Sequence, residues 1–290
     1  VARWNGSAFS YDELDGYIGP IAGTAANSVY AIGSAPDRVH HWNGATWSQL
    51  AEAPSGSAAL YYNDAWIDPS GAIWAVGMGG ALDRVTESTW EHLNGATHFA
   101  MSSACKGSAA LGTAVGYTIS IASGVVSQQY LLTGGASGWS AVEAIDAPIG
   151  TDSLTCGPSG DIWSASGNDA IWRRHDGAWT EHPLEFAHDI ADADLTDAGV
   201  LYTVEGSEVA ALEDSSWTVM NEPPEPLLAL WAASSTAVFA ASTNHFYRWD
   251  GAAWEELDAP DGYTADLFGR SAVYPSGASS SSHAAGRIHS

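Results

Sequence analysis

The sequence predicts an all-β protein made of seven copies of one unit of four short strands, because two series of aromatic residues recur along the chain. The first series follows an aliphatic residue at intervals of roughly 40 residues and comprises Tyr30, Trp74, Trp163, Tyr202, Phe239 and Tyr274, with Thr113 in the same place in a weaker copy. The second series alternates with the first and comprises Phe9, Trp47, Trp90, Trp139, Trp179, Trp217 and Trp254. Seven such units are typical of a seven-bladed β-propeller, in which each unit is one blade.

A turn signal before the second series sets the order of strands within each unit. An Asn-Gly or Asp-Gly pair, at positions 5–6, 43–44, 176–177 and 250–251, stands shortly before an aromatic residue of the second series. These residues tolerate positive φ, so each pair indicates a hairpin between two short strands. We therefore expect four strands per unit, A to D, with the first aromatic on strand B and the second at the start of strand D. Helical periodicity is absent.

The whole chain, residues 1–290, is predicted to be one propeller domain closed by both of its ends. The predicted blades, numbered 1 to 7 in chain order, are 16–55, 56–98, 99–147, 148–186, 187–225, 226–261, and 262–290 together with 1–15. In the last blade the N-terminal residues supply strands C and D, and the C-terminal residues supply A and B, which removes two free sheet edges. Two stacked β-sandwiches are the alternative, but a sandwich does not impose a seven-fold period.

The repeat resembles the short propeller repeats of bacterial secreted and surface proteins, and also the tryptophan-rich seven-bladed propeller lectins. The resemblance rests on segments such as 73–77 (IWAVG) and 248–251 (RWDG), and it covers the whole chain. The turn also resembles the Asp-box hairpin of sialidases, although most copies lack the serine and the second glycine of that motif. The resemblance implies an architecture, which proteins of many unrelated functions share.

The charge balance is strongly acidic, with 34 acidic residues, 9 basic residues and a net charge of −25. Nucleic-acid binding needs clustered Lys and Arg, so we expect no nucleic acid as a partner. An anionic membrane surface is excluded by the same argument, and no stretch approaches the ~20 apolar residues of a membrane span, so no membrane insertion is expected. The chain begins at Val1 with no recognisable signal peptide, which fits a processed form.

The two cysteines, Cys105 and Cys156, predict a disulfide between neighbouring blades. Both fall at the end of strand A, in blades 3 and 4, and the innermost strands of a propeller converge near its axis, where a bridge is geometrically possible. Two buried thiols are the alternative. A disulfide indicates an oxidising compartment, so the predicted location is extracellular, periplasmic or at the cell surface.

Acidic residues on the inner strands suggest a site in the axial tunnel. Counting back from the aromatic residue of strand B places four carboxylates on alternating inner-strand positions, near two large aromatic side chains: Asp64, Asp192, Asp194 and Asp266, with Trp66 and Trp231. Converging carboxylates need a cation or shared protons, so Ca²⁺ or a cationic ligand is the candidate occupant. A water-filled channel is the alternative, and we expect at least one of the four to pack between blades.

Catalytic and metal-binding motifs are absent from the sequence, including Gly-x-Ser-x-Gly, a P-loop and Cys-x-x-Cys. The neighbouring His40 and His41 point to opposite faces of one strand and cannot hold one ion together. The first hypothesis is therefore a secreted, non-catalytic ligand-binding propeller, lectin-like, that takes a glycan or a small cationic ligand. An axial hydrolase or lyase that uses aspartates with or without Ca²⁺ is one alternative, and a protein-interaction or structural module is another.

Overall fold

A computed structural model describes residues 1–4, 9–34, 38–53, 61–78, 81–93, 100–106, 111–119, 126–135, 138–145, 153–157, 159–166, 170–184, 190–196, 198–258 and 284–285. These residues form antiparallel sheets: five of four strands, one of five strands and one of two strands. Among them, no helix reaches the length and apolarity needed to cross a bilayer.

The five four-stranded sheets correspond to the predicted blades 2 to 6, and their strands follow the chain order. Blade 2 comprises β7 (Tyr62–Ile67), β8 (Ile73–Gly77), β9 (Leu82–Val85) and β10 (Trp90–His92). Blade 3 comprises β11 (Ala100–Lys106), β12 (Leu111–Ile119), β13 (Val126–Gly135) and β14 (Gly138–Ile145). Blade 4 comprises β15 (Ser153–Cys156), β16 (Ile162–Ser166), β17 (Ala170–His175) and β18 (Ala178–Pro183). Blade 5 comprises β19 (Asp192–Leu195), β20 (Leu201–Glu205), β21 (Glu208–Glu213) and β22 (Ser216–Val219), and blade 6 comprises β23 (Leu227–Ser234), β24 (Ala237–Ser242), β25 (Phe246–Trp249) and β26 (Trp254–Leu257).

The two remaining sheets contain the ends of the chain. Blade 1 comprises β3 (Tyr17–Ala25), β4 (Ser28–Ser34), β5 (Arg38–Trp42) and β6 (Trp47–Glu52), with β27 (Ala284–Ala285) paired to the inner edge of β3. The two-stranded sheet comprises β1 (Ala2–Trp4) and β2 (Phe9–Tyr11). Residues 284–285 were expected in the last blade, and they pair with blade 1 because β3 offers an edge to hydrogen bond.

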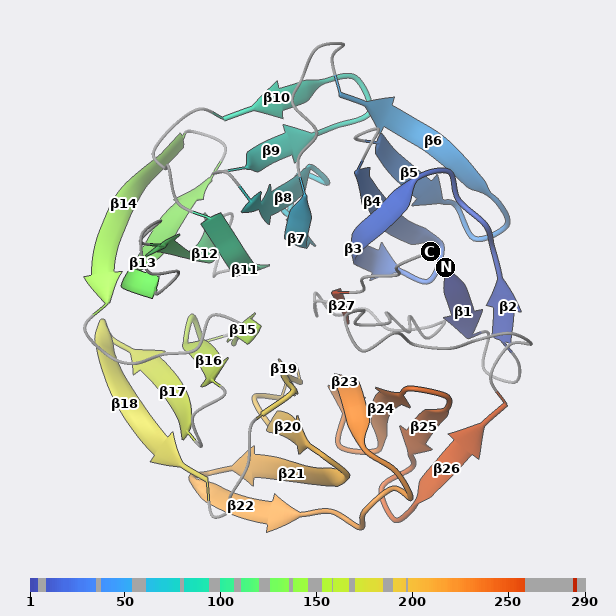
Figure 1. Ribbon diagram of the computed structural model, residues 1–290, viewed down its shortest axis with the longest axis vertical. Helices are drawn as coiled ribbons and strands as arrows, with labels where there is room; N and C mark the ends of the chain where they lie inside the picture. Colours follow the sequence, from blue (N-terminus) through green and yellow to red (C-terminus); the bar gives the residue numbers. More distant parts are fainter. Residues whose placement is uncertain are drawn as a thin grey trace.

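The sheets are arranged in a ring, with the first strand of each sheet toward the centre and the last strand at the rim (Figure 1). The prediction of an all-β propeller with four-stranded antiparallel blades is confirmed. The predicted number of seven such blades is not confirmed, because the described residues give five four-stranded sheets. Closure by the two chain ends stays a prediction, because residues 259–283 and 286–290 lie outside the described residues.

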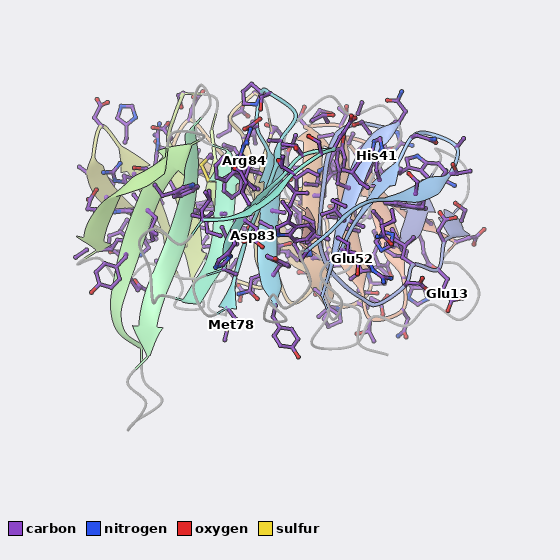
Figure 2. All side chains as sticks on the ribbon, turned by 90° about the horizontal axis from the view of Figure 1, so that it is seen from above. Glu13, His41, Glu52, Met78, Asp83 and Arg84 are labelled. Carbon is purple, nitrogen blue, oxygen red and sulfur yellow. A yellow bond between two sulfur atoms is a disulfide. The ribbon has the colours of Figure 1, made fainter. Side chains whose placement is uncertain are left out.

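The core lies in the seams between neighbouring blades, because each sheet is covered on both faces. The second strands β8 and β20 are buried along their whole length, whereas the outer strand β22 is mostly exposed. The turns that join first to second strands and third to fourth strands share one face of the ring. Figure 2 shows the ring edge-on, with His41 and Arg84 toward that face and Met78 and Glu13 toward the other.

The predicted disulfide is confirmed: Cys105 at the end of β11 is bonded to Cys156 at the end of β15, with their Cα atoms 5.6 Å apart. Cys105 is fully buried. The bond joins the innermost strands of blades 3 and 4 across their seam. Equal placement in consecutive repeats was therefore a sound geometric signal, because the inner strands of neighbouring blades approach each other near the axis.

Candidate functional site

Two aspartates of the predicted axial cluster form the same bridge between blades at two different seams. Asp64 on β7 accepts a hydrogen bond from the N–H of Ala104 on β11 at 2.8 Å. Asp192 on β19 accepts one from the N–H of Leu230 on β23 at 3.0 Å. In each case the other carboxylate oxygen accepts the N–H of the following residue. These carboxylates point sideways into the seams, toward the next blade.

Asp194 forms a third bridge of this kind, and it accepts the N–H of Ala232 on β23 at 2.8 Å. The strands β7 and β19 lie on opposite sides of the ring (Figure 1), so the three aspartates do not share one site. The expectation that at least one of them packs between blades is confirmed. Asp266 lies outside the described residues. Among the residues that the structure describes, no group of three or more His, Cys, Asp or Glu side chains is placed to hold a metal ion, and Ca²⁺ binding stays a prediction.

The tryptophans proposed as ligand contacts are packed in seams. Trp66 is 4% exposed and stacks on Trp74, with ring centroids 5.7 Å apart. Trp231 is 3% exposed and packs against Phe239 at 5.4 Å. Their burial leaves no open indole face for a ligand in this conformation, and ligand binding at these positions stays a prediction.

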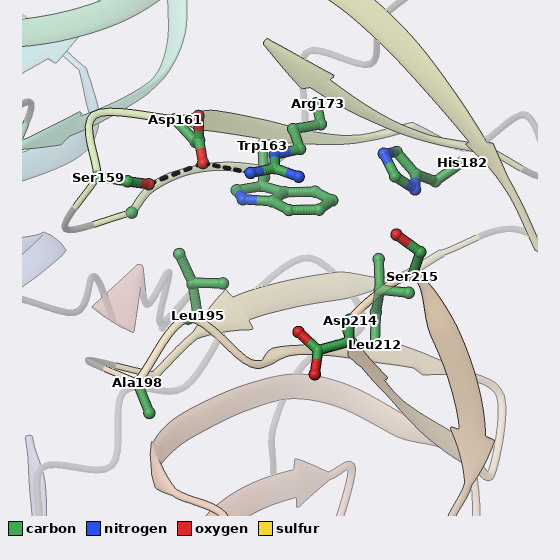
Figure 3. A pocket seen from close by; sticks show the side chains of 12 residues that line it. Ser159, Asp161, Trp163, Arg173, His182, Leu195, Ala198, Leu212, Asp214 and Ser215 are labelled. Carbon is green, nitrogen blue, oxygen red and sulfur yellow. Dashed lines mark hydrogen bonds and ion pairs between the residues drawn. The ribbon is translucent and has the colours of Figure 1, made fainter. Parts of the chain in front are cut away.

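A groove of about 480 Å³ opens between blades 4 and 5 (Figure 3). Its blade 4 wall consists of Gly157, Ser159, Asp161, Trp163, Arg173 and His182, and its blade 5 wall of Leu195, Ala198, Gly199, Leu212, Asp214 and Ser215. The volume falls within the range that is typical of small-molecule sites, and the walls combine polar groups with the apolar side chains of Trp163, Leu195 and Leu212. We treat this groove as the candidate functional site.

Asp161 organises the blade 4 wall of the groove. It ends the turn between β15 and β16, is 5% exposed, and accepts hydrogen bonds from Ser159 Oγ and Arg173 Nη2, both at 2.7 Å. His175 Nδ1 lies 2.5 Å from its other oxygen. Burial by itself would raise the pKa of Asp161, but the hydrogen bonds from Arg173, His175 and Ser159 outweigh it and lower the pKa to about 2. The carboxylate is therefore ionised and anchors Arg173.

Two side chains cover the indole of Trp163. The guanidinium of Arg173 lies over the ring at 5.1 Å from its centroid, and the imidazole of His182 lies 5.3 Å away. Burial and then the charge of Arg173 lower the pKa of His182, so this imidazole is neutral at neutral pH. The blade 4 wall thus offers a fixed cation and a neutral imidazole.

The blade 5 wall offers hydrogen-bonding groups from one tight turn. Asp214 and Ser215 join β21 to β22 and have positive φ angles of 46° and 69°. Two consecutive residues with positive φ form the type of hairpin that matches the twist of paired strands. Figure 3 shows the side chains of Asp214 and Ser215 on the side of the groove opposite Asp161.

Sequence reasoning missed this groove, although one signal was available. Arg84 and Arg173 each pair in register with the strand B aromatic of their blade, Trp74 and Trp163, and Arg248 does the same with Phe239. Basic residues are rare in this chain, so an arginine that recurs at the same position of the repeat indicates a structural or binding function for that position. Which of these positions opens to solvent depends on the facing blade.

Comparisons with known proteins identify the fold. No protein-family model matches the chain, and no curated protein matches its sequence. Among solved structures, the chain is similar to YCF48 bound to D1 peptide, with a TM-score of 0.65 and 14% identity over 87% of this chain and 86% of that one. It is also similar to a gluconolactonase from Xanthomonas campestris, with a TM-score of 0.53 and 12% identity over 77% and 83% of the two chains. Identities this low show a shared propeller fold and carry no assignment of activity.

Proposed function

We propose that this protein is a secreted, non-catalytic ligand-binding propeller whose site is the groove between blades 4 and 5. The observation that carries the proposal is the anchored guanidinium of Arg173, which Asp161 holds at the wall of a 480 Å³ groove. A fixed donor orients a ligand at a low entropic cost, because the side chain is ordered before the ligand arrives.

A carbohydrate is the first candidate ligand. The groove has the size of a small polar molecule, and its walls carry a guanidinium, a neutral imidazole, a hydroxyl and a carboxylate, which together donate to and accept from sugar hydroxyl groups. A small cationic ligand remains the alternative for the acidic inner strands. Binding of nucleic acid or insertion into a membrane is not part of the proposal, since the net charge of −25 opposes both anionic surfaces.

Peptide binding is the second candidate function, and it rests on the similarity to YCF48 bound to D1 peptide. That similarity extends over most of both chains, so a peptide site on the same architecture is feasible. The gluconolactonase neighbour favours the enzymatic alternative in the same way, but the three described aspartates of the proposed axial site already accept backbone hydrogen bonds.

We also propose that the ring has seven blades and is closed by residues 1–15 with 262–290. The support is the packing of the N-terminal residues against blade 1: the guanidinium of Arg3 lies 4.0 Å from the ring centroid of Trp42, and Trp47 Nε1 donates to Asp12 at 3.2 Å. The disulfide supports an oxidising compartment, either extracellular, periplasmic or at the cell surface.

A glycan array with matched variants tests the proposed site. Arg173→Met keeps the hydrophobic stem over Trp163 but removes the guanidinium, and Arg84→Met makes the same change at the equivalent position of blade 2. Binding by the wild-type protein and by the Arg84 variant, with loss in the Arg173 variant, is the expected pattern. Equal binding by all three proteins would move the site elsewhere, and a peptide array in place of glycans tests the second candidate.

A further inference from the structure

We infer that the groove between blades 4 and 5 recognises a carboxylate, and that its ligand is a sugar acid rather than a neutral saccharide. This inference rests on the proposed function and adds the chemical class of the ligand. Four features of the groove carry it: the free donors of Arg173, the covered face of Trp163, the exposed carboxylate across the groove, and the residue that leaves the groove open.

Arg173 has donors left after its bond to Asp161. Its Nη2 donates to Asp161 Oδ2 at 2.7 Å. Its Nε is buried, so the donors that remain for a ligand are Nη1 and the second N–H of Nη2, for which the described residues supply no hydrogen-bond partner. The side chain is 33% exposed, so the guanidinium reaches the groove while Asp161 fixes its plane. A planar guanidinium with free N–H groups binds a carboxylate through two parallel hydrogen bonds, which are stronger than bonds to a neutral hydroxyl.

Trp163 is not available as a stacking surface for a neutral sugar. The ring is 8% exposed, with Arg173 over it at 5.1 Å and His182 beside it at 5.3 Å. Neutral saccharides gain much of their affinity from the apolar face of a ring stacked on an exposed aromatic side chain. With that face covered, recognition in this groove depends on the charged and polar groups, and the N–H groups that the ion pair with Asp161 leaves free on Arg173 make a carboxylate their strongest acceptor.

The opposite wall explains why the anion belongs to a polyhydroxylated molecule. Asp214 is exposed, forms no ion pair within the part of the chain that the structure describes, and repels an anion close to it. A ligand that spans the groove must therefore present its carboxylate to Arg173 and hydrogen-bond donors to Asp214. A uronic acid does so, because it carries one carboxylate at one end and several hydroxyl groups elsewhere on its ring.

Leu212 keeps the groove open, as a comparison within the ring shows. In the register of the repeats, Leu212 pairs with Trp217 as Trp42 pairs with Trp47. At the seam with the N-terminal residues, the ring of Trp42 covers the guanidinium of Arg3 at 4.0 Å. Leu212 has no such ring, so the corresponding guanidinium of Arg173, which lies over Trp163 of its own blade, meets a groove where Arg3 meets an indole of the next blade.

Calorimetric titration of the full chain with paired probes tests the inference. The probes are D-glucuronate with D-glucose, and N-acetylalanine with N-acetylalanine amide, each pair differing by a carboxylate. We expect D-glucuronate to bind and D-glucose to bind at least roughly 10-fold more weakly, since hydrogen bonds between charged groups contribute about 1.5–3 kcal/mol. Leu212→Trp, which fills the groove without removing a polar group, and Arg173→Met should each abolish that preference, and Arg84→Met should keep it. Melting curves confirm that each variant is folded.

Each result supports or overturns the inference, and separates it from the proposed function. If glucose and glucuronate bind equally well and Leu212→Trp removes both, the carboxylate preference is overturned and the groove remains a saccharide site. Binding of N-acetylalanine without glucuronate would overturn the sugar acid in favour of a peptide terminus. If neither Leu212→Trp nor Arg173→Met changes the binding, the inference is overturned and the proposed site must lie elsewhere. If neither carboxylate probe gives a saturable heat, the inference is overturned but the proposed site is unaffected.

Discussion

The seam between blades 2 and 3 is packed with tryptophan, whereas the seam between blades 4 and 5 holds a groove. In the first, the rings of Trp66, Trp74 and Trp139 lie within 5.7 to 6.0 Å of one another. In the second, Trp163 meets Leu195 and Leu212 of the next blade in one core cluster. Both seams carry an arginine paired with the strand B tryptophan, Arg84 with Trp74 and Arg173 with Trp163. Both also carry a buried aspartate, Asp68 or Asp161, at the turn between the first two strands of the blade. The same repeat therefore supports a closed and an open seam.

The residue that faces the strand D tryptophan accounts for the difference. Gly134 pairs with Trp139 in blade 3, and a Cβ atom at position 134 would lie 2.5 Å from the ring of Trp139. The glycine therefore lets that ring lie across its strand and reach blade 2. In blade 5 the equivalent residue is Leu212, which pairs with Trp217 and occupies this space itself. The ring of Trp139 thus closes the seam between blades 2 and 3, and the candidate site lies beside the blade in which Leu212 stands in place of Gly134.

Removal of the disulfide between the two seams should have the largest effect. Cys105 and Cys156 are 51 residues apart, and the chain-entropy model gives roughly 4 kcal/mol of unfolding free energy for a loop of this size. Urea unfolding of the oxidised protein and of the Cys105→Ala, Cys156→Ala double variant measures the difference. Because Cys156 precedes the turn that holds Asp161, binding in the groove should weaken as well, and unchanged stability would show that blades 3 and 4 are held mainly by packing.

Gly134→Ala should break the closed seam. The added methyl group would lie 2.6 Å from the Cα of Trp139, a backbone atom that cannot move aside, and we expect a loss of about 2–3 kcal/mol. Gly71→Ala in the same blade pair is the control, because nothing lies within 4 Å of its Cβ position and only its φ of 85° opposes the change. Its expected cost is about 1 kcal/mol, and equal losses in the two variants would contradict the packing argument.

Replacement of an aspartate that bridges two blades should lower the free energy of unfolding. In Asp192→Asn with Asp194→Asn, an amide replaces a carboxylate that accepts N–H groups from two chain segments. We expect a loss of about 2 kcal/mol, because backbone donors are left without good acceptors. Had the pair repelled each other in an empty cation site, the same change would raise stability. A calcium titration of both proteins, followed by calorimetry, tests the prediction of an axial ion directly.

Acid should weaken the seam between blades 4 and 5 through Asp161. Its pKa is about 2, below the ordinary value of 3.8 for an aspartate, so its stabilising contribution is fully present above pH 3.8 and is lost as the pH falls toward about 2. The loss is at most about 2 kcal/mol. Asp161→Asn should flatten the unfolding free energy between pH 4 and 2 relative to the wild type, and an unchanged pH profile would show that Arg173 and His175 do not stabilise the charge.

The smallest effect is expected from His182 in the groove. Burial and then Arg173 lower its pKa below 6.5, so the folded state disfavours the proton and loses stability as the pH falls below 6.5 toward the lowered pKa. His182→Gln should reduce that slope. An NMR titration of the ring protons measures the pKa, and a midpoint at or above 6.5 would contradict the packing of His182 beside Arg173 and Trp163.

Much of the fold follows from local pattern in the sequence. The strand B segments were predicted from an aliphatic-aromatic pair, and β8, β16, β20 and β24 contain those pairs. The cysteine bridge followed from equal placement in two repeats. The groove could not be predicted in this way, because it requires knowing that Leu212 of one blade faces Arg173 of the blade before it.

The sequence alone determined the repeat, the four-stranded blade and the disulfide, since each depends on spacing along the chain or on residues with strong turn and strand preferences. Tertiary structure decided what the polar and aromatic residues do. Asp64 lies on the predicted inner strand, but its carboxylate turns to the N–H of Ala104 in the next blade, because an inner strand is flanked by neighbours on both faces. Seams between blades join residues far apart in sequence, and the side chain on the opposite strand, which no local pattern records, determines whether a seam closes on itself or opens to a ligand.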